Sequence, residues 1–240
     1  MSWFRKNYVY VGLMAIVALI EVPTCIMMKG QGEFIPRFMG VVFEVDCLPI
    51  YDVIQFMLPW MLIQIIVGNY LYMQLTQLEC YVLPRYQSVR KWYQSISLRG
   101  IRICCICITI WFAITILLMF VCSPSNLYLA LTRKLFGSYF LMLSQALVWF
   151  SIQLILILGM RKQEIAFIMV LVVPLFSIML STRLYEYMSY MPGNWMMFTR
   201  SNRVCEYGSP LYLITIGGLV ILFINWWLGL IIVRERRRRV

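Results

Sequence analysis

The sequence predicts an all-α polytopic membrane protein, and three observations lead to that class. The chain of 240 residues is 62% hydrophobic and only 13% charged, whereas soluble domains are nearer half apolar and a quarter charged. Its mean hydropathy is +0.80. Its apolar residues gather in six runs, and each is close to the roughly 20 residues that a helix needs to cross hydrocarbon. No polar segment is long enough to bury a core of its own, so residues 1–240 form a single transmembrane domain.

The six predicted spans alternate with polar connections. They cover about residues 8–28, 50–73, 103–122, 138–160, 165–181 and 211–233. The first run is expected to stay in the protein, because it is too long for the apolar core of a signal peptide. The fifth is the shortest and contains Pro174.

The distribution of basic residues predicts the orientation of the spans. Fourteen of the 21 Lys and Arg residues fall on one side when both termini are placed inside, including the arginine run at the C-terminus. Cytoplasmic loops carry an excess of Lys and Arg. We therefore predict that both termini are cytoplasmic and that the protein lies in the plasma membrane, with its bilayer as a partner. The net charge of +11 needs no nucleic-acid partner, because topology accounts for it.

The residue inventory argues against most catalytic and metal chemistry. The sequence has no histidine, which is the commonest general base and a common metal ligand. Cys104 and Cys107 form a CxxC pair, but they lie in an apolar run without a second pair. We read them as packing residues and predict no catalytic residue, no metal and no cofactor bound by this chain.

Among the polar residues inside predicted spans, four define a possible substrate path. They are Glu21, Gln64, Gln145 and Asn225. An ionisable group in a membrane is a functional hypothesis by default, although Glu21 could also reach interfacial water. Buried amides equally serve to bond neighbouring helices, so path and packing both stay open.

A basic and aromatic segment separates the second and third spans. Pro84 suits the first turn of a helix. Beyond it Tyr86, Val89, Tyr93 and Ile96 recur at helical spacing and share one face. The segment is predicted to be an amphipathic helix on the cytoplasmic surface. A loop that merely lies on anionic lipid is the alternative.

The connection before the last span, residues 182–210, is rich in aromatic residues and methionine. Its candidate residues are Tyr185, Tyr190, Trp195 and Phe198. It is predicted to form two short amphipathic pieces that enter the outer leaflet and return, covered by other spans, since broken helices at that depth need protein around them. Cys47 and Cys205 fall on the same outer side, where a disulfide between them is possible.

This arrangement resembles the membrane subunit of a type-2 ABC exporter. It is similar in particular to the permeases of bacterial lantibiotic and bacteriocin immunity systems. The stretch from Arg85 to Trp92 looks like the RYxSxxxW signature of those permeases.

The resemblance implies that the basic segment is a coupling helix that docks on a separate ATPase subunit. The residues it assigns to docking are Leu83, Pro84, Arg85, Tyr86, Val89, Arg90, Lys91, Trp92 and Tyr93. It also implies that the aromatic connection is the outer re-entrant helix pair. The implied partners are a dimer of ATP-binding subunits, which would hold ATP and Mg, a second permease copy or sister permease, and a peptide substrate. No phosphate-binding G-x-x-x-x-G-K-[ST] loop occurs in this chain.

Other functions remain as alternatives. A non-pumping membrane protein that binds or senses a peptide is the first of them. A secondary transporter and an intramembrane enzyme are weaker, since the sequence shows neither repeat symmetry nor paired catalytic groups. The expected function is thus ATP-driven export of an antimicrobial peptide or another amphipathic compound.

Overall fold

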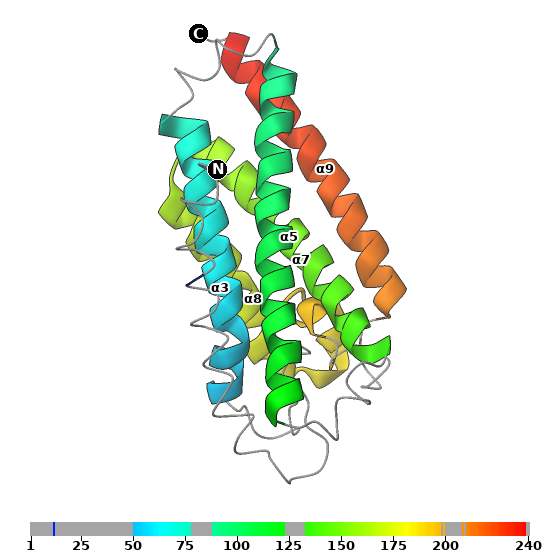
Figure 1. The fold of residues 1–240 in the computed structure, drawn as a ribbon. Helices are drawn as coiled ribbons and strands as arrows, with labels where there is room; N and C mark the ends of the chain where they lie inside the picture. The colour runs from blue at the N-terminus through cyan, green and yellow to red at the C-terminus, as the bar shows by residue number, and fades with distance from the viewer. Residues whose placement is uncertain are drawn as a thin grey trace.

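The computed structural model describes residues 50–77, 88–122, 133–197 and 210–238, together with residues 12, 199 and 208. These residues are almost all helical, and no strand occurs among them (Figure 1). Of the first predicted span, about 8–28, only Gly12 is described, in a helix; the rest lies outside the described residues.

The helices follow in chain order as α3 (Ile50–Tyr72), η2 (Met73–Gln77), α5 (Val89–Cys122), α7 (Arg133–Met160), α8 (Gln163–Arg183), η5 (Tyr185–Tyr190), η6 (Asn194–Met196) and α9 (Leu211–Arg238). Five helices in this part of the chain are long and apolar enough to cross a membrane. The predicted spans 50–73, 138–160, 165–181 and 211–233 coincide with α3, α7, α8 and α9 to within a few residues.

The third predicted span needs a correction. We expected a surface helix up to about Ile96 and a separate span from Ile103, but one helix, α5, runs without interruption from Val89 through 34 residues. Ser88 starts it: the Ser88 hydroxyl accepts from the Lys91 amide at 3.2 Å, as an N-cap does. At about 1.5 Å per residue α5 is about 51 Å long, well beyond the hydrocarbon thickness of about 30 Å.

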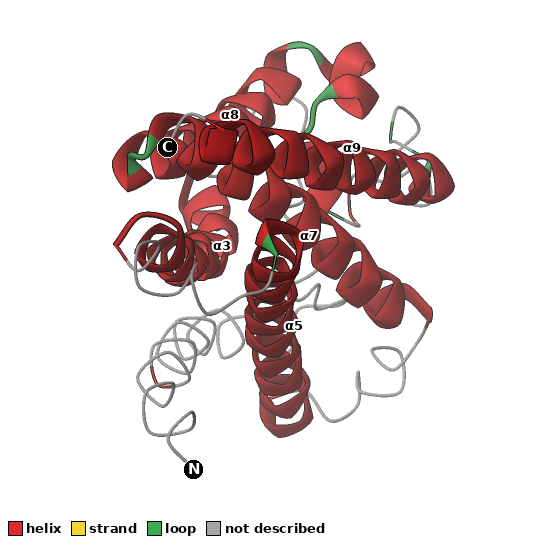
Figure 2. Ribbon diagram, turned by 90° about the horizontal axis from the view of Figure 1, so that it is seen from above, coloured by secondary structure: helices red, strands yellow, loops and turns green. Residues whose placement is uncertain are grey.

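Helix α7 lies at the centre of the bundle. It contacts α3, α5, α8 and α9 (Figure 2). Helices α3, α7 and α9 run toward the end of the bundle at which α5 begins, and α5 and α8 run the other way (Figure 1). The main core joins all five helices through large side chains such as Trp60, Trp111 and Phe150. Burial of such aromatic groups is the main packing contribution to the fold.

Glycines allow three of the closest contacts. A Cβ on Gly100 would lie 2.4 Å from the Phe150 ring, and one on Gly68 would lie 2.4 Å from the Gln153 amide nitrogen. A Cβ on Gly193 would lie 2.2 Å from the Pro174 carbonyl oxygen. Small residues of this kind let membrane helices approach one another.

The connection after α8 folds back onto the bundle. Its described part, up to Met197, contains the two 3₁₀-helices η5 and η6, with Met191, Pro192 and Gly193 between them. Asn194 is buried; its side-chain amide donates to the Met188 carbonyl at 3.1 Å, and its oxygen accepts from the Ser181 hydroxyl at 3.3 Å. The two short pieces are therefore covered by protein where Gly193 meets α8, as expected, but they are 3₁₀ turns and not amphipathic α-helices.

Candidate functional site

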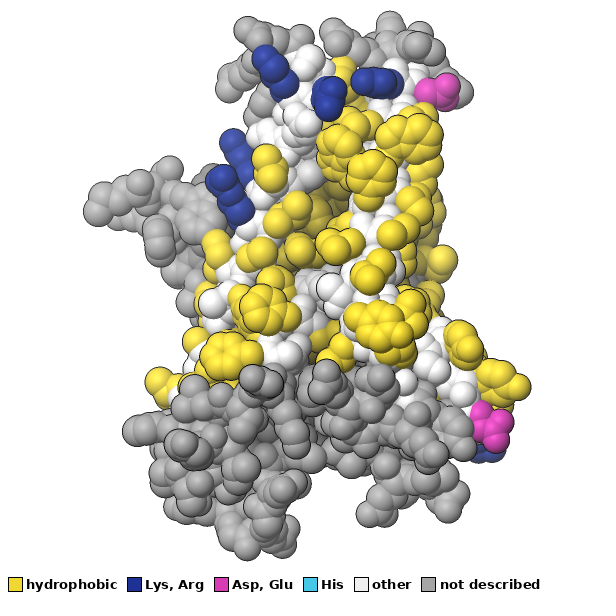
Figure 3. All heavy atoms as spheres, turned by 90° about the vertical axis from the view of Figure 1, so that its right-hand side faces the viewer, with side chains coloured by type: hydrophobic (Ala, Val, Ile, Leu, Met, Phe, Trp, Pro, Cys, Tyr) yellow, Lys and Arg dark blue, Asp and Glu magenta, His cyan; other side chains and the backbone are white. Residues whose placement is uncertain are grey.

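One end of the bundle carries most of the described exposed cations. We call it the basic end; its exposed cations are Arg90, Lys91, Arg99, Arg102, Arg161, Lys162 and Arg234. The acids Glu164 and Glu235 lie beside them. Away from this end the exposed side chains of α5 and α9 are mostly apolar, and Figure 3 shows this change from blue to yellow along one face. The boundary marks where a membrane surface would lie.

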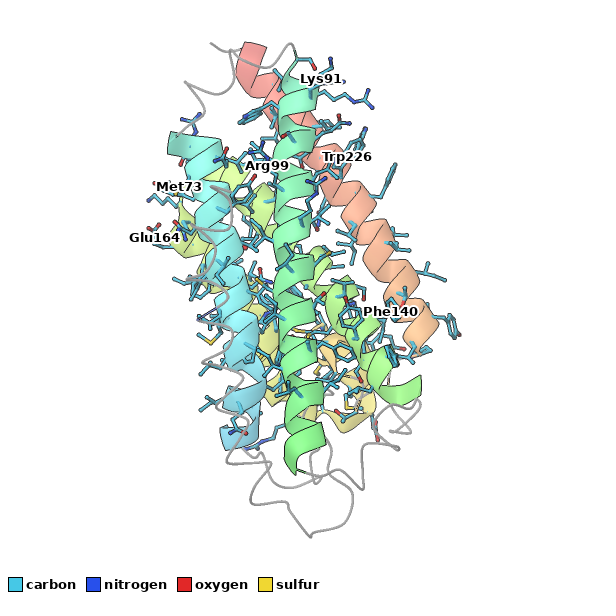
Figure 4. All side chains as sticks on the ribbon, in the orientation of Figure 1. Met73, Lys91, Arg99, Phe140, Glu164 and Trp226 are labelled. Carbon is cyan, nitrogen blue, oxygen red and sulfur yellow. The ribbon has the colours of Figure 1, made fainter. Side chains whose placement is uncertain are left out.

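Helices α5 and α9 extend beyond the others at the basic end. Figure 4 places Lys91 farther along the bundle than Met73 of η2 and Glu164 of α8. The last turns of α9 reach the same level in Figure 1. The first turns of α5 and the last turns of α9 thus form a projecting pair of helices.

The projecting pair is held together by aromatic residues that we predicted to be at a docking surface. Trp92 is 1% exposed and Tyr93 is 0% exposed, and both belong to the same core cluster as Leu230 and Val233 of α9. Trp92 therefore faces the interior of the bundle in this structure, and its docking on a separate subunit stays a prediction. The physical reason for this burial is that α9 packs against this turn of α5, which the local periodicity does not reveal.

The remaining predicted docking residues divide into two groups. Arg90 and Lys91 are exposed, and Val89 is partly buried. The other four, Leu83, Pro84, Arg85 and Tyr86, lie outside the described residues. Arg90 and Lys91 are the part of the predicted surface that the structure leaves open to a partner.

A second cluster lies inside the bundle, where α7 meets α3. The Gln153 side chain crosses between the helices, and its amide nitrogen donates to the Gln64 main-chain carbonyl at 3.1 Å. Gly68, one turn after Gln64, leaves the space that Gln153 fills. This bond fixes the register between α3 and α7.

Other buried polar groups accompany this bond. We call the set Trp60, Gln64, Gln145, Trp149 and Gln153 the polar seam. Neither polar atom of the Gln64 or Gln145 side chain has a hydrogen-bond partner among the described residues, nor do the Gln153 amide oxygen and the Trp60 and Trp149 indole nitrogens. An unsatisfied buried group costs about 1–3 kcal/mol. If these side chains served only to bond neighbouring helices, their polar atoms would be hydrogen-bonded to those helices, and most of them are not.

The spacing of the seam residues follows the helical repeat. Gln145, Trp149 and Gln153 are each four residues apart, so they lie along one side of α7. Gln145, at the other end of this row, lies near α9, where its amide nitrogen is 3.8 Å from the position a Cβ would take on Gly218. The row therefore leads from the α9 side of α7 to the α3 side.

Asn225 lies apart from the seam and is paired. Its side-chain amide donates to the Ser151 hydroxyl at 2.8 Å, and that hydroxyl donates to the Val148 carbonyl at 2.6 Å. Asn225 thus bonds α9 to α7. Of the four predicted path residues, Gln64 and Gln145 belong to the seam, Asn225 is in a helix-to-helix bond, and Glu21 lies outside the described residues.

The predicted aromatic residues of the last connection are spread out. Tyr190 is 78% exposed, while Trp195 is partly buried and its indole nitrogen donates to the Ser189 carbonyl at 2.8 Å. Tyr185 lies in η5. Phe198, Cys47 and Cys205 lie outside the described residues, so the role of Phe198 and the disulfide both stay predictions.

The CxxC pair is part of the core. Cys104 and Cys107 are free and buried in α5. Within the described ranges, no group of three His, Cys, Asp or Glu residues could hold a metal ion. The packing interpretation of these cysteines agrees with their burial.

Sequence reasoning left three members of the seam out of the path. These are Gln153, Trp60 and Trp149, none of which was among the predicted path residues. The signal that finds them is the four-residue spacing of polar or partly polar side chains in two apolar runs, Trp60-Gln64-Gly68 and Gln145-Trp149-Gln153. Seen together, the two runs indicate facing helices with a small residue opposite a glutamine.

The fold and the two clusters define a class: a helical protein compatible with a multi-pass membrane location, with a basic end and a neutral polar interior. Comparisons with protein-family models, with curated proteins and with solved structures find no match.

Proposed function

We propose that this chain is the membrane subunit of an ATP-driven exporter of the ABC type. It works with a separate dimer of ATP-binding subunits, which hold ATP and Mg²⁺, and with a second copy or a sister permease. Its cargo is an amphipathic compound, such as an antimicrobial peptide, that is removed from the bacterial plasma membrane. The basic end faces the cytoplasm in this proposal.

The observation that carries the proposal is the continuity of α5. Its first turns project at the basic end with Arg90 and Lys91 exposed, and the same helix then runs through the bundle. A force applied to Arg90 and Lys91 would act directly on a membrane-spanning helix, because no loop intervenes to absorb the movement.

The packing of α5 supports transmission of that force to other helices. Trp92 and Tyr93 share a core cluster with α9, and Phe150 of α7 packs against Gly100 of α5. Close-packed interiors transmit displacement because they are not continuously deformable. A shift of the α5 end would therefore move α9 and α7 as well, which is the kind of rearrangement that a pump driven from one end needs.

The test is purification of the full chain from its native membrane, with identification and assay of any ATPase that accompanies it. The proposal expects an ATP-binding subunit to co-purify, and expects the chain to stimulate its ATPase activity in lipid nanodiscs. Arg90→Ala with Lys91→Ala should abolish the stimulation, because both exposed cations on the projecting turn are lost.

Arg183→Ala is the matched control. Arg183 is an exposed cation at the end of α8 away from the basic end, so this variant should retain stimulation. Absence of any co-purifying ATPase, or stimulation that survives the double substitution in a correctly folded protein, would contradict the proposal. A peptide that binds without an ATPase would instead favour the non-pumping alternative.

A further inference from the structure

We infer that the polar seam is a binding site for a neutral hydrogen-bonding group, an amide or a hydroxyl, of the compound that the protein moves. The inference rests on the proposed function, since it assigns a substrate chemistry to that function. It concerns Gln64 on α3 and Gln145 and Gln153 on α7, with the indoles of Trp60 and Trp149.

The first step is that most polar atoms of the seam glutamines have no hydrogen-bond partner among the described residues. Gln64 is 1% exposed, Gln145 is 1% exposed and Gln153 is 0% exposed. Five of the six polar atoms on these three side chains have no partner in the described part of the chain; the exception is the Gln153 nitrogen. A membrane interior holds no bulk water to satisfy such atoms.

The second step is the chemistry of the atoms on offer. A glutamine amide supplies two N–H donors and a carbonyl acceptor, and an indole supplies one donor. The seam therefore presents both donors and acceptors. A peptide amide or a hydroxyl, which donates and accepts at once, complements such a set.

The third step is the absence of charge. No Lys, Arg, Asp or Glu is among the buried residues of the described chain. A buried ion without a counterion is strongly disfavoured. The seam is thus suited to a neutral group, and a cationic head group would have no carboxylate to pair with there.

The fourth step is how such a group gains entry. Where α3 meets α7, the Gln153 side chain occupies the space over Gly68 and bonds to the Gln64 carbonyl. Rotation of Gln153 together with separation of α3 from α7 exposes the amides of both helices. The movement passed from α5 to α7 in the proposed pump supplies that separation.

The test uses cysteine accessibility in the full chain in lipid nanodiscs, with its eight native cysteines replaced by alanine. Gln64→Cys and Gln145→Cys are treated with a neutral water-soluble methanethiosulfonate. The controls are Ile65→Cys and Phe140→Cys, whose side chains face outward on the same helices. The seam positions should react and the outward positions should not, because a thiol in hydrocarbon stays un-ionised.

Two probes distinguish a seam that only admits water from a seam that binds a neutral hydrogen-bonding group. Dodecanoyl-Gly-Gly-amide carries neutral amides, and dodecyltrimethylammonium has the same chain length with a cationic head. At ten times its Kd the amide probe should slow labelling of the seam cysteines about tenfold by occupancy, and the cation should not. Labelling that neither probe slows means that water alone enters, and this overturns the inference.

Two other outcomes also overturn it: no labelling at either seam position, or equal protection by both probes. If the cysteine-free chain fails to fold, the same comparison is made on the native chain by thermal unfolding. The amide probe should raise the unfolding temperature of the wild type and have no effect on Gln64→Leu with Gln145→Leu. Co-purification of an ATPase is scored separately, so failure of the inference leaves that result for the proposed function unchanged.

Discussion

The phenolic oxygen of Tyr93 lies directly over Gly229, so close that a Cβ on residue 229 would be 2.0 Å from it. This contact joins α5 to α9 near the basic end, and it leaves no room for any larger residue.

Gly229→Ala should therefore destabilise the protein by about 1–3 kcal/mol, the usual cost of overpacking. Tyr93→Phe removes the nearest atom but leaves the ring carbon Cζ 2.6 Å from that Cβ, so the double variant Tyr93→Phe with Gly229→Ala should recover only part of the loss. Unfolding in a graded detergent titration measures each term of this double-mutant cycle. If the effects of the two substitutions on the free energy of unfolding were simply additive, the contact between Tyr93 and Gly229 would not be the cause of the destabilisation.

The Gln153–Gly68 contact leads to a second prediction. In Gly68→Ala the new methyl group displaces the Gln153 amide from the Gln64 carbonyl. The loss should be about 1 kcal/mol, the net value of a hydrogen bond of this kind. Adding Gln153→Met should relieve the clash and make the Gly68→Ala change nearly neutral. The same detergent titration reports both, and a Gly68→Ala protein as stable as wild type would contradict the geometry.

Gly193 and Gly217 form a contrasting pair. A Cβ on Gly193 meets the Pro174 carbonyl oxygen at 2.2 Å, whereas nothing lies within 4 Å of a Cβ on Gly217. A main-chain oxygen cannot swing aside, so Gly193→Ala should cost about 3 kcal/mol or more. Gly217→Ala should be neutral or add up to about 1 kcal/mol, because alanine favours a helix. Thermal unfolding followed by size-exclusion chromatography ranks the two variants.

The Asn225–Ser151 bond predicts a modest effect. Asn225→Leu removes a hydrogen bond between α9 and α7, and such bonds between membrane helices contribute about 0.6 kcal/mol on average. Thr215→Val is the control, because the Thr215 hydroxyl bonds only to the Leu211 carbonyl of its own helix, at 2.8 Å. A larger loss for Thr215→Val than for Asn225→Leu would contradict this assignment.

Hydropathy predicted four helices of the described part well because a membrane-spanning stretch must be apolar along its whole length. It missed the start of α5 for the same reason: Arg90, Lys91, Arg99 and Arg102 lie outside the apolar part, yet they continue the same helix. Hydropathy reports where lipid would be, and it does not report where a helix ends.

The site was predicted less completely than the fold. Helical spacing placed Tyr93 and Ile96 on one face, and both are buried, although the docking role that the resemblance implies put Tyr93 at a surface. It could not place Trp92, because Trp92 is buried in a core cluster that joins helices far apart in the chain. Gln64 and Gln145 could be predicted as path residues because glutamines are rare in apolar runs. Trp60 and Trp149 could not, because tryptophan is a large, mainly apolar side chain that is common in the core.

The turn between α7 and α8 has a consequence for how the bundle can move. Only Arg161 and Lys162 separate the two helices, and Arg161 makes the reversal with a φ of 55°. A connection of two residues has no slack, so neither helix can slide along its axis without unwinding the other. The α7–α8 hairpin must then tilt as one unit, and a tilt of α7 also moves the η5–η6 turns at the opposite end of the bundle, because the Ser181–Asn194 hydrogen bond joins them to α8.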